Sequence, residues 1–251
     1  MLKLENLSIG YNGHSVVRHI NLTFRKGEIT TIIGKNGTGK STLLKSATSL
    51  HKALSGSVTL EGRKQQEFTR KEWARKVAFL SQNHTDSACT VQSLVEHGRY
   101  PHLGFSKRMG EEDYTIVDKA ITTMGIGALG NKGLLKISGG ERQKAYLAMV
   151  LAQDTPYIAL DEPATYLDLS VQKEILTLLD ELRRQGKCII AVMHDLGSAL
   201  QVSDHICLLD RGKVVSYTTP EGLVASHLIE EVFGVECTKV SSKKGLRYLF
   251  S

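Results

Sequence analysis

The feature that most constrains this chain is a glycine-rich octapeptide, Gly34–Ser41, with the pattern G-x-x-x-x-G-K-[ST]. It follows a β-branched run, Ile29–Ile33, and precedes Thr42-Leu43-Leu44-Lys45, so its context is strand, turn and helix. Glycines let the backbone curl until successive N–H groups converge on phosphate oxygens, and a helix N-terminus adds partial positive charge. Lys40 can then reach the β- and γ-phosphates, and the Ser41 hydroxyl can ligate Mg²⁺. The octapeptide therefore predicts a loop that binds the phosphates of a nucleotide.

Composition places the chain among ordinary globular proteins. Its 251 residues, 41% hydrophobic and 23% charged, can form one large domain with a substantial core. The net charge of +6 permits anionic partners, but no basic patch is interleaved with aromatic residues. We therefore expect a solvated basic surface and no nucleic-acid partner.

The cysteines and apolar runs indicate a compartment and a relation to membranes. Four widely spaced cysteines form no C-x-x-C pair, and Cys188 and Cys207 lie in apolar runs, which predicts buried thiols and a reducing compartment. The first residues alternate like a strand rather than a signal peptide, and no apolar run approaches the ~20 residues that span a bilayer. The expected protein is soluble, or peripheral on a membrane partner.

The N-terminal part is predicted to form an antiparallel layer beside a parallel core. Residues Leu2–Ile9 are spaced as a half-buried strand, Asn12-Gly13 is a hairpin signal, and Ile20–Phe24 alternate as a second strand. A further short strand is expected to begin at Ser57. Tyr11, in the hairpin, is either an exposed turn residue or a stacking platform for a base, and the pattern alone favours the exposed turn residue.

A core strand and a mostly helical insertion follow. Val77–Leu80 reads as a strand, and Gln82 just beyond it either caps the strand or faces a ligand crevice, since ligands bind at the carboxyl ends of parallel strands. Helices are predicted from Thr90 to Gly98 and over residues 111–125, so residues 87–153 are expected to be mostly helical.

The stretch Ser138-Gly139-Gly140-Glu141 opens the next predicted helix and has two interpretations. Ser138 and Glu141 fit the capping box S-x-x-E. Two glycines at helix positions cost stability unless something must approach the backbone closely, which favours an accessible anion-binding helix start.

Two later strands end in polar residues. Tyr157–Glu162 is an apolar strand that ends in two carboxylates, and because successive residues point in different directions, Asp161 can serve a metal while Glu162 faces a water on the γ-phosphate. Cys188–Met193 is a second buried strand with His194 at its carboxyl end, where contact with a γ-phosphate is expected.

The rest of the chain carries a weaker pattern. A helix is predicted over residues 171–185, and strands are predicted near 206–209 and 213–217. The tail, residues 220–251, is short and mixed, and no element is predicted in it.

With these residues in place, the sequence resembles the ATP-binding subunit of ABC transporters over nearly its whole length. The matching motifs are Gly34–Ser41 (Walker A), Gln82 (Q-loop), Ile137–Gln143 (signature motif), Tyr157–Glu162 (Walker B), Ala164–Asp168 (D-loop) and His194 (switch histidine). Tyr11 falls where the family places its adenine-stacking aromatic residue, which reverses the expectation from the pattern alone.

The resemblance implies an α/β fold: a P-loop NTPase (RecA-like) parallel core with an antiparallel β layer and a helical subdomain. The whole chain, 1–251, would be one ABC ATPase domain. Its nucleotide-binding core would comprise residues 1–86 and 154–219, the helical subdomain residues 87–153, and the tail residues 220–251.

The resemblance also implies ATP and Mg²⁺ as cofactors and assigns site residues. The nucleotide contacts would be Tyr11, Gly34, Asn36, Gly37, Thr38, Gly39, Lys40, Ser41 and Thr42, with Ser138, Gly139, Gly140, Glu141 and Asp168. The catalytic residues would be Glu162 as general base, His194, Lys40 and Gln82, and the metal site would use Ser41, Gln82 and Asp161.

The same resemblance implies partners. A second copy would pair head to tail, so that each ATP lies between Walker A of one subunit and Ser138-Gly139-Gly140 of the other. The dimer would bind permease subunits at the cytoplasmic face of the membrane and serve, indirectly, an extracytoplasmic substrate-binding protein.

Within the family, Gly98–His102 and Tyr166-Leu167-Asp168 are most similar to importers of ferric siderophores, haem or cobalamin. The chain departs from many relatives in carrying Glu141 in place of glutamine and Ala164 in place of threonine or serine. The alternatives are an importer subunit for another small solute, a non-transport ABC ATPase and a small-molecule P-loop kinase.

Overall fold

The computed structural model describes residues 1–83, 88–104, 108–242 and 245–251. Its central element is a six-stranded sheet with the order β10 (Lys213–Thr218), β9 (His205–Asp210), β3 (Ile29–Ile33), β8 (Cys188–Val192), β7 (Tyr157–Asp161) and β6 (Val77–Leu80). The neighbours from β9 to β6 pair in parallel, and β10 pairs antiparallel with β9. β3, β7 and β8 are buried along their whole lengths, as expected for parallel strands covered on both faces.

A second, antiparallel sheet lies beside the first. It has the order β2 (His14–Phe24), β1 (Leu2–Tyr11), β4 (Ser55–Leu60) and β5 (Arg63–Lys64). The predicted hairpin is present: Asn12 and Gly13 both have positive φ, 51° and 79°, which suits a two-residue turn. β4 begins at Ser55, two residues before the predicted start.

Helix α1 (Lys40–Ala47) fills the space between the two sheets. It contacts β1 on one side and β7 and β8 on the other, and its Leu43 and Leu44 side chains are fully buried. The helix that begins at the phosphate loop is therefore held from two sides.

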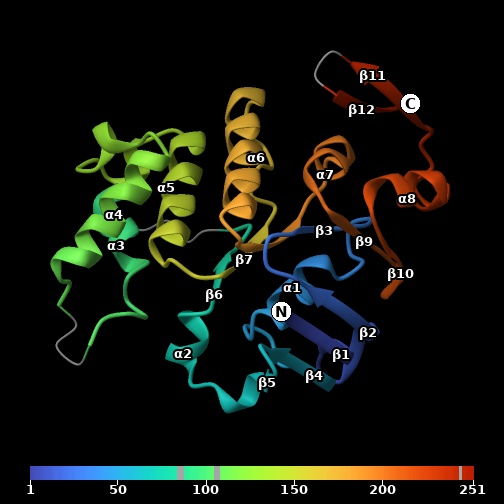
Figure 1. The fold of residues 1–251 in the computed structure, drawn as a ribbon, viewed down its shortest axis with the longest axis horizontal. Helices are drawn as coiled ribbons and strands as arrows, with labels where there is room; N and C mark the ends of the chain where they lie inside the picture. The colour runs from blue at the N-terminus through green and yellow to red at the C-terminus, as the bar shows by residue number, and fades with distance from the viewer. Residues whose placement is uncertain (84–87, 105–107, 243–244) are drawn as a thin grey trace.

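Helices α6 (Leu169–Arg184) and α7 (Leu196–Val202) cover the opposite face of the central sheet, as Figure 1 shows. Each is capped at its N-terminus by an aspartate side chain: Asp168 accepts from the Ser170 and Val171 amides, and Asp195 accepts from the Ser198 amide. α6 begins two residues earlier than predicted, and α7 was not predicted.

Helices α3 (Val91–His97), α4 (Glu111–Thr123) and α5 (Gly139–Ala152) pack together at one side of the central sheet (Figure 1). Short elements connect the rest: η1 (Gln65–Glu67), α2 (Arg70–Ala74), η2 (Gly127–Leu129) and η3 (Leu134–Lys136). The helix predicted from Thr90 is present and capped by the Thr90 side chain. The domain boundary predicted at residues 86 and 87 lies outside the described residues.

The C-terminal residues form elements that the sequence pattern did not predict. α8 (Pro220–Ala225) and α9 (Leu228–Phe233) lead into a hairpin of β11 (Cys237–Ser242) and β12 (Gly245–Phe250). Tyr248 and Phe250 pack against the main core, and Arg247 hydrogen-bonds Gln201 on α7. The hairpin thus covers α7, the helix that follows His194.

Two predictions from composition can be compared with the fold. Cys188 and Cys207 are buried free thiols, as predicted, and burial raises the pKa of each to about 12. Among the described helices, none combines the length and apolar character needed to cross a bilayer.

The motif Gly98–His102 connects helices within the helical part of the chain. Arg99 is 5% exposed, and it donates to Asp113 on α4 at 2.9 Å and to the Ala152 carbonyl at the end of α5 at 2.9 Å. His102 Nε2 lies 2.8 Å from the Gln153 carbonyl, whereas Tyr100 is 59% exposed. Within this importer-like motif, Arg99 and His102 therefore have internal partners and Tyr100 faces outward.

Candidate functional site

The loop after β3 requires glycine at two of its positions. Gly34 has φ 154°, and a Cβ there would lie 2.2 Å from the Leu209 carbonyl oxygen. Gly39 has φ 98°, and a Cβ there would lie 2.4 Å from Val17 Cγ2. Both positions favour glycine for backbone conformation and for space, so the spacing of the octapeptide follows from its geometry.

Lys40, the first residue of α1, is only 6% exposed. Its ammonium group donates to the carbonyl oxygens of Gly34 at 2.8 Å and Lys35 at 3.0 Å. Burial lowers the Lys40 pKa, and the carboxylates of Glu162 and Asp161 act in the opposite direction. From this position the ammonium group could exchange its loop carbonyl partners for phosphate oxygens.

Ser41 and Asp161 meet between α1 and the end of β7. The Ser41 hydroxyl donates to Asp161 Oδ1 at 2.8 Å, and Asp161 is 2% exposed. Burial raises the Asp161 pKa, against the effect of the Ser41 hydrogen bond. A hydroxyl and a buried carboxylate are hard oxygen donors, and they fit Mg²⁺, which takes one or two protein ligands together with phosphate oxygens and water.

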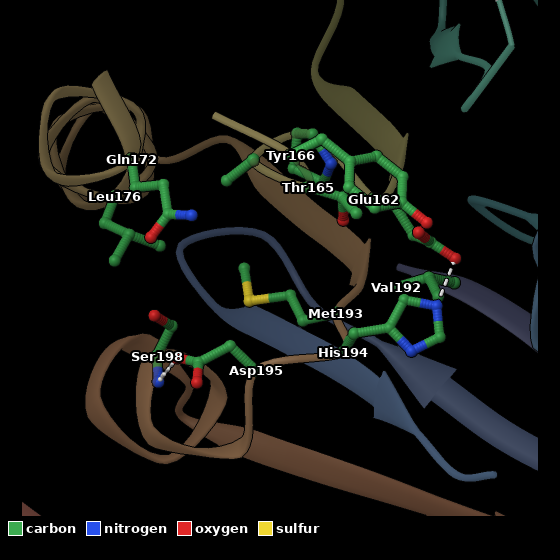
Figure 2. Close-up of a pocket in the computed structure, with 12 residues that line it drawn as sticks. Glu162, Thr165, Tyr166, Gln172, Leu176, Val192, Met193, His194, Asp195 and Ser198 are labelled. Atoms are coloured by element: carbon green, nitrogen blue, oxygen red, sulfur yellow. Dashed lines mark hydrogen bonds and ion pairs between the residues drawn. The ribbon is translucent and has the colours of Figure 1, made fainter. Parts of the chain in front are cut away.

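Glu162 follows β7 and has partners on both carboxylate oxygens. Gln82 Nε2 donates to Oε2 at 2.7 Å, and His194 Nε2 lies 2.5 Å from Oε1, the contact drawn in Figure 2. The Glu162 side chain is 5% exposed, and that of His194 is 38% exposed. The backbone of Glu162 has φ 55°, and its N–H donates to the Val192 carbonyl, so the end of β8 holds it in place. Gln82, His194 and Glu162 therefore form one cluster.

These side chains border an open hollow of about 390 Å³, within the roughly 300–1,000 Å³ usual for small-molecule sites. Its lining comprises Val16, Asn36, Gly37, Gly39, Lys40, Ser41, Thr42, Gln82, Glu162, Tyr166 and His194. Nine of these were predicted as site residues, and a tenth, Tyr166, belongs to the D-loop run. Val16 carried no signal that could have identified it.

Other predicted residues lie near the hollow without lining it. Thr38 donates through its hydroxyl to the Lys35 carbonyl inside the loop, at 2.8 Å. Tyr11 is half-exposed at the end of β1, with its hydroxyl oxygen 3.4 Å from Thr42 Oγ1 on α1.

The predicted residues of the signature motif do not line the hollow. The capping box is complete: Glu141 Oε2 accepts from the Ser138 amide at 2.8 Å, and Ser138 Oγ accepts from the Glu141 amide. Hydrogen bonds with Ser138 lower the Glu141 pKa, and the bond from the Ser138 backbone amide has the larger effect. Asp168 lies apart from the hollow as well, at the N-terminus of α6. In a single subunit the structure brings together Walker A, Gln82, Glu162 and His194, and leaves the signature residues and Asp168 elsewhere.

A parallel sheet, a phosphate loop between β3 and α1, and two carboxylates at the end of β7 define a P-loop NTPase, so the predicted fold class is confirmed. The family model described as ABC transporter matches residues 17–165. The chain belongs to the ABC transporter family. The small-molecule kinase alternative is thereby excluded.

Curated relatives match nearly the whole chain. The chain is 42% identical over 238 residues to the ferric enterobactin transport ATP-binding protein FepC of Escherichia coli (strain K12), covering 94% of this chain and 88% of that protein. It is 37% identical over 245 residues to the iron(3+)-hydroxamate import ATP-binding protein FhuC of Bacillus subtilis (strain 168), covering 97% and 91%.

Solved structures match as well. A metal-chelate type ABC transporter in an inward-facing conformation superposes with a TM-score of 0.85 over 100% of this chain and 96% of that one, at 24% identity. The ATP-binding cassette MJ0796, a post-hydrolysis dimer bound to ADP and Pi, superposes with a TM-score of 0.77 over 88% and 99%, at 26% identity. The chain is an ATP-hydrolysing subunit of a family that couples ATP hydrolysis to transport.

Proposed function

We propose that this subunit hydrolyses Mg-ATP in a head-to-tail dimer and thereby powers a membrane permease that imports an iron chelate. The observation that carries the proposal is the carboxylate of Glu162, buried at the edge of the phosphate-loop hollow and held by His194 and Gln82. A carboxylate in that place suits a general base for a water that attacks the γ-phosphate.

Each group of the hollow has a distinct task in this mechanism. Backbone N–H groups of Gly37 and Gly39 hold phosphate oxygens, and Lys40 moves from its carbonyl partners to the β- and γ-phosphates. Ser41 and Asp161 would hold Mg²⁺, with Gln82 near the same position, and the bound ion would neutralise charge on the phosphates.

Glu162 and His194 act on the attacking water and the γ-phosphate. Glu162 accepts the proton of the water, and His194 binds the γ-phosphate after leaving Glu162. The base is thus freed only when the phosphate draws His194 away.

A second copy would complete the site. Within one subunit Ser138-Gly139-Gly140 does not line the hollow, and an added Cβ at Gly139 would meet nothing within 4 Å. Tyr166 and Leu169, on either side of Asp168, are 96% and 84% exposed, so both large side chains lie almost entirely at the surface of the single subunit. A head-to-tail partner would cover them and bring its signature helix to the γ-phosphate.

The cargo is proposed from the relatives. FepC and FhuC are named for ferric enterobactin and iron(3+)-hydroxamate, and the petrobactin import proteins FpuD and YclP are 38% identical to this chain. We propose a ferric siderophore as the principal cargo. Haem and corrinoids are the other cargoes that the proposal includes. An extracytoplasmic binding protein would deliver it, and the subunit would lie on the cytoplasmic face, attached through the permease.

Uptake measurements test the cargo. In cells or vesicles that contain the assembled transporter, we expect ATP-dependent uptake of a ferric siderophore, and we expect Lys40→Ala to abolish it because that variant loses the phosphate-binding ammonium. Lys213→Ala, which removes an exposed lysine on β10, should transport normally. Uptake of an amino acid or sugar that depends on Lys40, with no response to iron chelates, haem or corrinoids, would contradict the cargo proposal alone.

The importer-like motif gives a separate test of permease binding. We expect Tyr100→Ala to fold normally but to co-purify poorly with the permease, because the ring is exposed beside His97, with ring centroids 4.8 Å apart. Arg99→Ala should instead lower the free energy of unfolding by about 3 kcal/mol, since it leaves Asp113 without its buried partner. Chemical denaturation and co-purification distinguish the two, and intact permease binding by folded Tyr100→Ala would contradict the docking role.

A further inference from the structure

The half-exposed Tyr11 ring has a neighbour that no motif predicted. The imidazole of His51 lies beside it, with ring centroids 4.6 Å apart and planes inclined by 45°. An exposed tyrosine ordinarily has free rotation about its side-chain bonds, which it loses when a ligand stacks on it. A second ring against one side of Tyr11 restricts that freedom before any ligand binds.

His51 is itself held in place. Its backbone N–H donates to the Lys45 carbonyl in the last turn of α1 at 3.2 Å. Its Nε2 lies 2.8 Å from the carbonyl oxygen of Gly10, and because a carbonyl only accepts, Nε2 carries the hydrogen. Through its backbone and its side chain, His51 therefore links the C-terminal end of α1 to the residue that precedes Tyr11.

The other end of the tyrosine also reaches α1. The Tyr11 hydroxyl is 3.4 Å from Thr42 Oγ1 in the first turn of that helix. On the strand side Gly10 lies close to the opposite strand, since a Cβ there would lie 1.9 Å from the His14 carbonyl oxygen. Tyr11 is thus connected to α1 near both ends of the helix, and the same helix begins with Lys40 and Ser41.

We propose that His51 is a positioning residue for the purine base of the bound nucleoside triphosphate. It acts through Tyr11: it holds the ring at a fixed distance from the phosphate loop, so that base and phosphates engage without further ordering. The inference rests on the proposed role of Tyr11 as the base platform. The ordering that His51 spares corresponds to a roughly three- to tenfold gain in nucleotide affinity.

The test compares ligands with and without a base. Calorimetry on the full chain measures binding of Mg-ADP, which carries the base, and of pyrophosphate, which does not. We expect His51→Ala to weaken Mg-ADP binding roughly three- to tenfold and to leave pyrophosphate binding unchanged. In steady-state hydrolysis, KM for ATP should rise by a similar factor while kcat stays the same.

Two conservative variants separate the parts of the contact and guard against misfolding. His51→Phe keeps a ring beside Tyr11 and loses the bond to Gly10, whereas His51→Gln keeps an N–H donor and loses the ring. Each should recover part of the Mg-ADP affinity. Lys52→Ala, at the neighbouring exposed position, should behave as wild type.

Measuring Tyr11→Ala in parallel shows whether an unexpected result contradicts the role of His51 alone or also the role of Tyr11 as the base platform. Weaker Mg-ADP binding by Tyr11→Ala with unchanged binding by His51→Ala would overturn the inference and leave the base platform standing. Unchanged binding by both variants would overturn the platform and the inference together. Equal losses for Mg-ADP and pyrophosphate in all His51 variants would show that His51 supports α1 in general and would also overturn the inference.

Discussion

Replacing Glu162 by glutamine should reduce ATP turnover by about 10² to 10⁴-fold, the usual contribution of a general base. The amide has nearly the shape of the carboxylate, and its oxygen can still accept from His194. Its nitrogen can donate to the Gln82 side-chain oxygen if that amide turns over. The variant is therefore expected to lose the ability to accept a proton and to keep the local structure.

The same variant should keep its affinity for ATP and accumulate as a dimer. Lys40, Ser41 and the loop amides are unchanged, so ATP still favours the closed state, and hydrolysis no longer ends it. Gel filtration with Mg-ATP, together with phosphate release, measures both effects. Glu181→Gln, at an exposed position on α6, serves as the control and should behave as wild type. Wild-type turnover by Glu162→Gln would refute the assignment of the base.

Replacing Gly139 by aspartate should abolish dimer formation and lower turnover by about 100-fold or more, the scale expected when a group that stabilises transition-state charge is lost. The isolated subunit should tolerate the change, because a Cβ at Gly139 meets nothing within 4 Å. The new carboxylate would stand at the start of α5, where the γ-phosphate held by the other copy is expected to dock.

Near-normal binding of ATP by the isolated Gly139→Asp subunit would accompany these losses, since its own phosphate loop is intact. Gly127→Asp is a matched control: Gly127 is also exposed, lies in η2, and has open space around its Cβ position. Rapid hydrolysis by Gly139→Asp would mean that the signature helix does not meet the nucleotide, and the head-to-tail arrangement would be wrong.

The parts of the site that could be predicted from sequence are those in which neighbouring residues share one task. The phosphate loop needs glycine at Gly34 and Gly39 for backbone geometry, and Lys40-Ser41 directly after Gly39. Its spacing can therefore be recognised in the sequence. Asp161 and Glu162 stand together at the end of an apolar strand, so this pair can also be recognised from neighbouring residues alone. Periodicity was equally informative for α6, where Ile175, Leu178, Leu179 and Leu182 form one buried face.

Elements without a marked periodicity were missed. α7 is only seven residues long and contains Gly197 and Ser198, which are poor helix formers, so its stability depends on packing. The β11–β12 hairpin has no turn signal between its strands, and its Tyr248 and Phe250 become core residues only when they meet the rest of the fold. For short elements such as these, tertiary contacts outweigh local preference.

Contacts between distant residues set the rest. The chain alone names Gln82, Glu162 and His194 as polar residues after three strands, and parallel pairing predicts only that they share one edge of the sheet. That both oxygens of Glu162 are occupied, one by Gln82 and one by His194, follows from the positions of β6, β7 and β8 side by side. The contact of His51 with Tyr11 joins residues 40 positions apart and carries no motif, because it arises where α1 passes between the two sheets. Local chemistry is thus readable from residue order, whereas the pairing of side chains depends on how strands and helices pack in three dimensions.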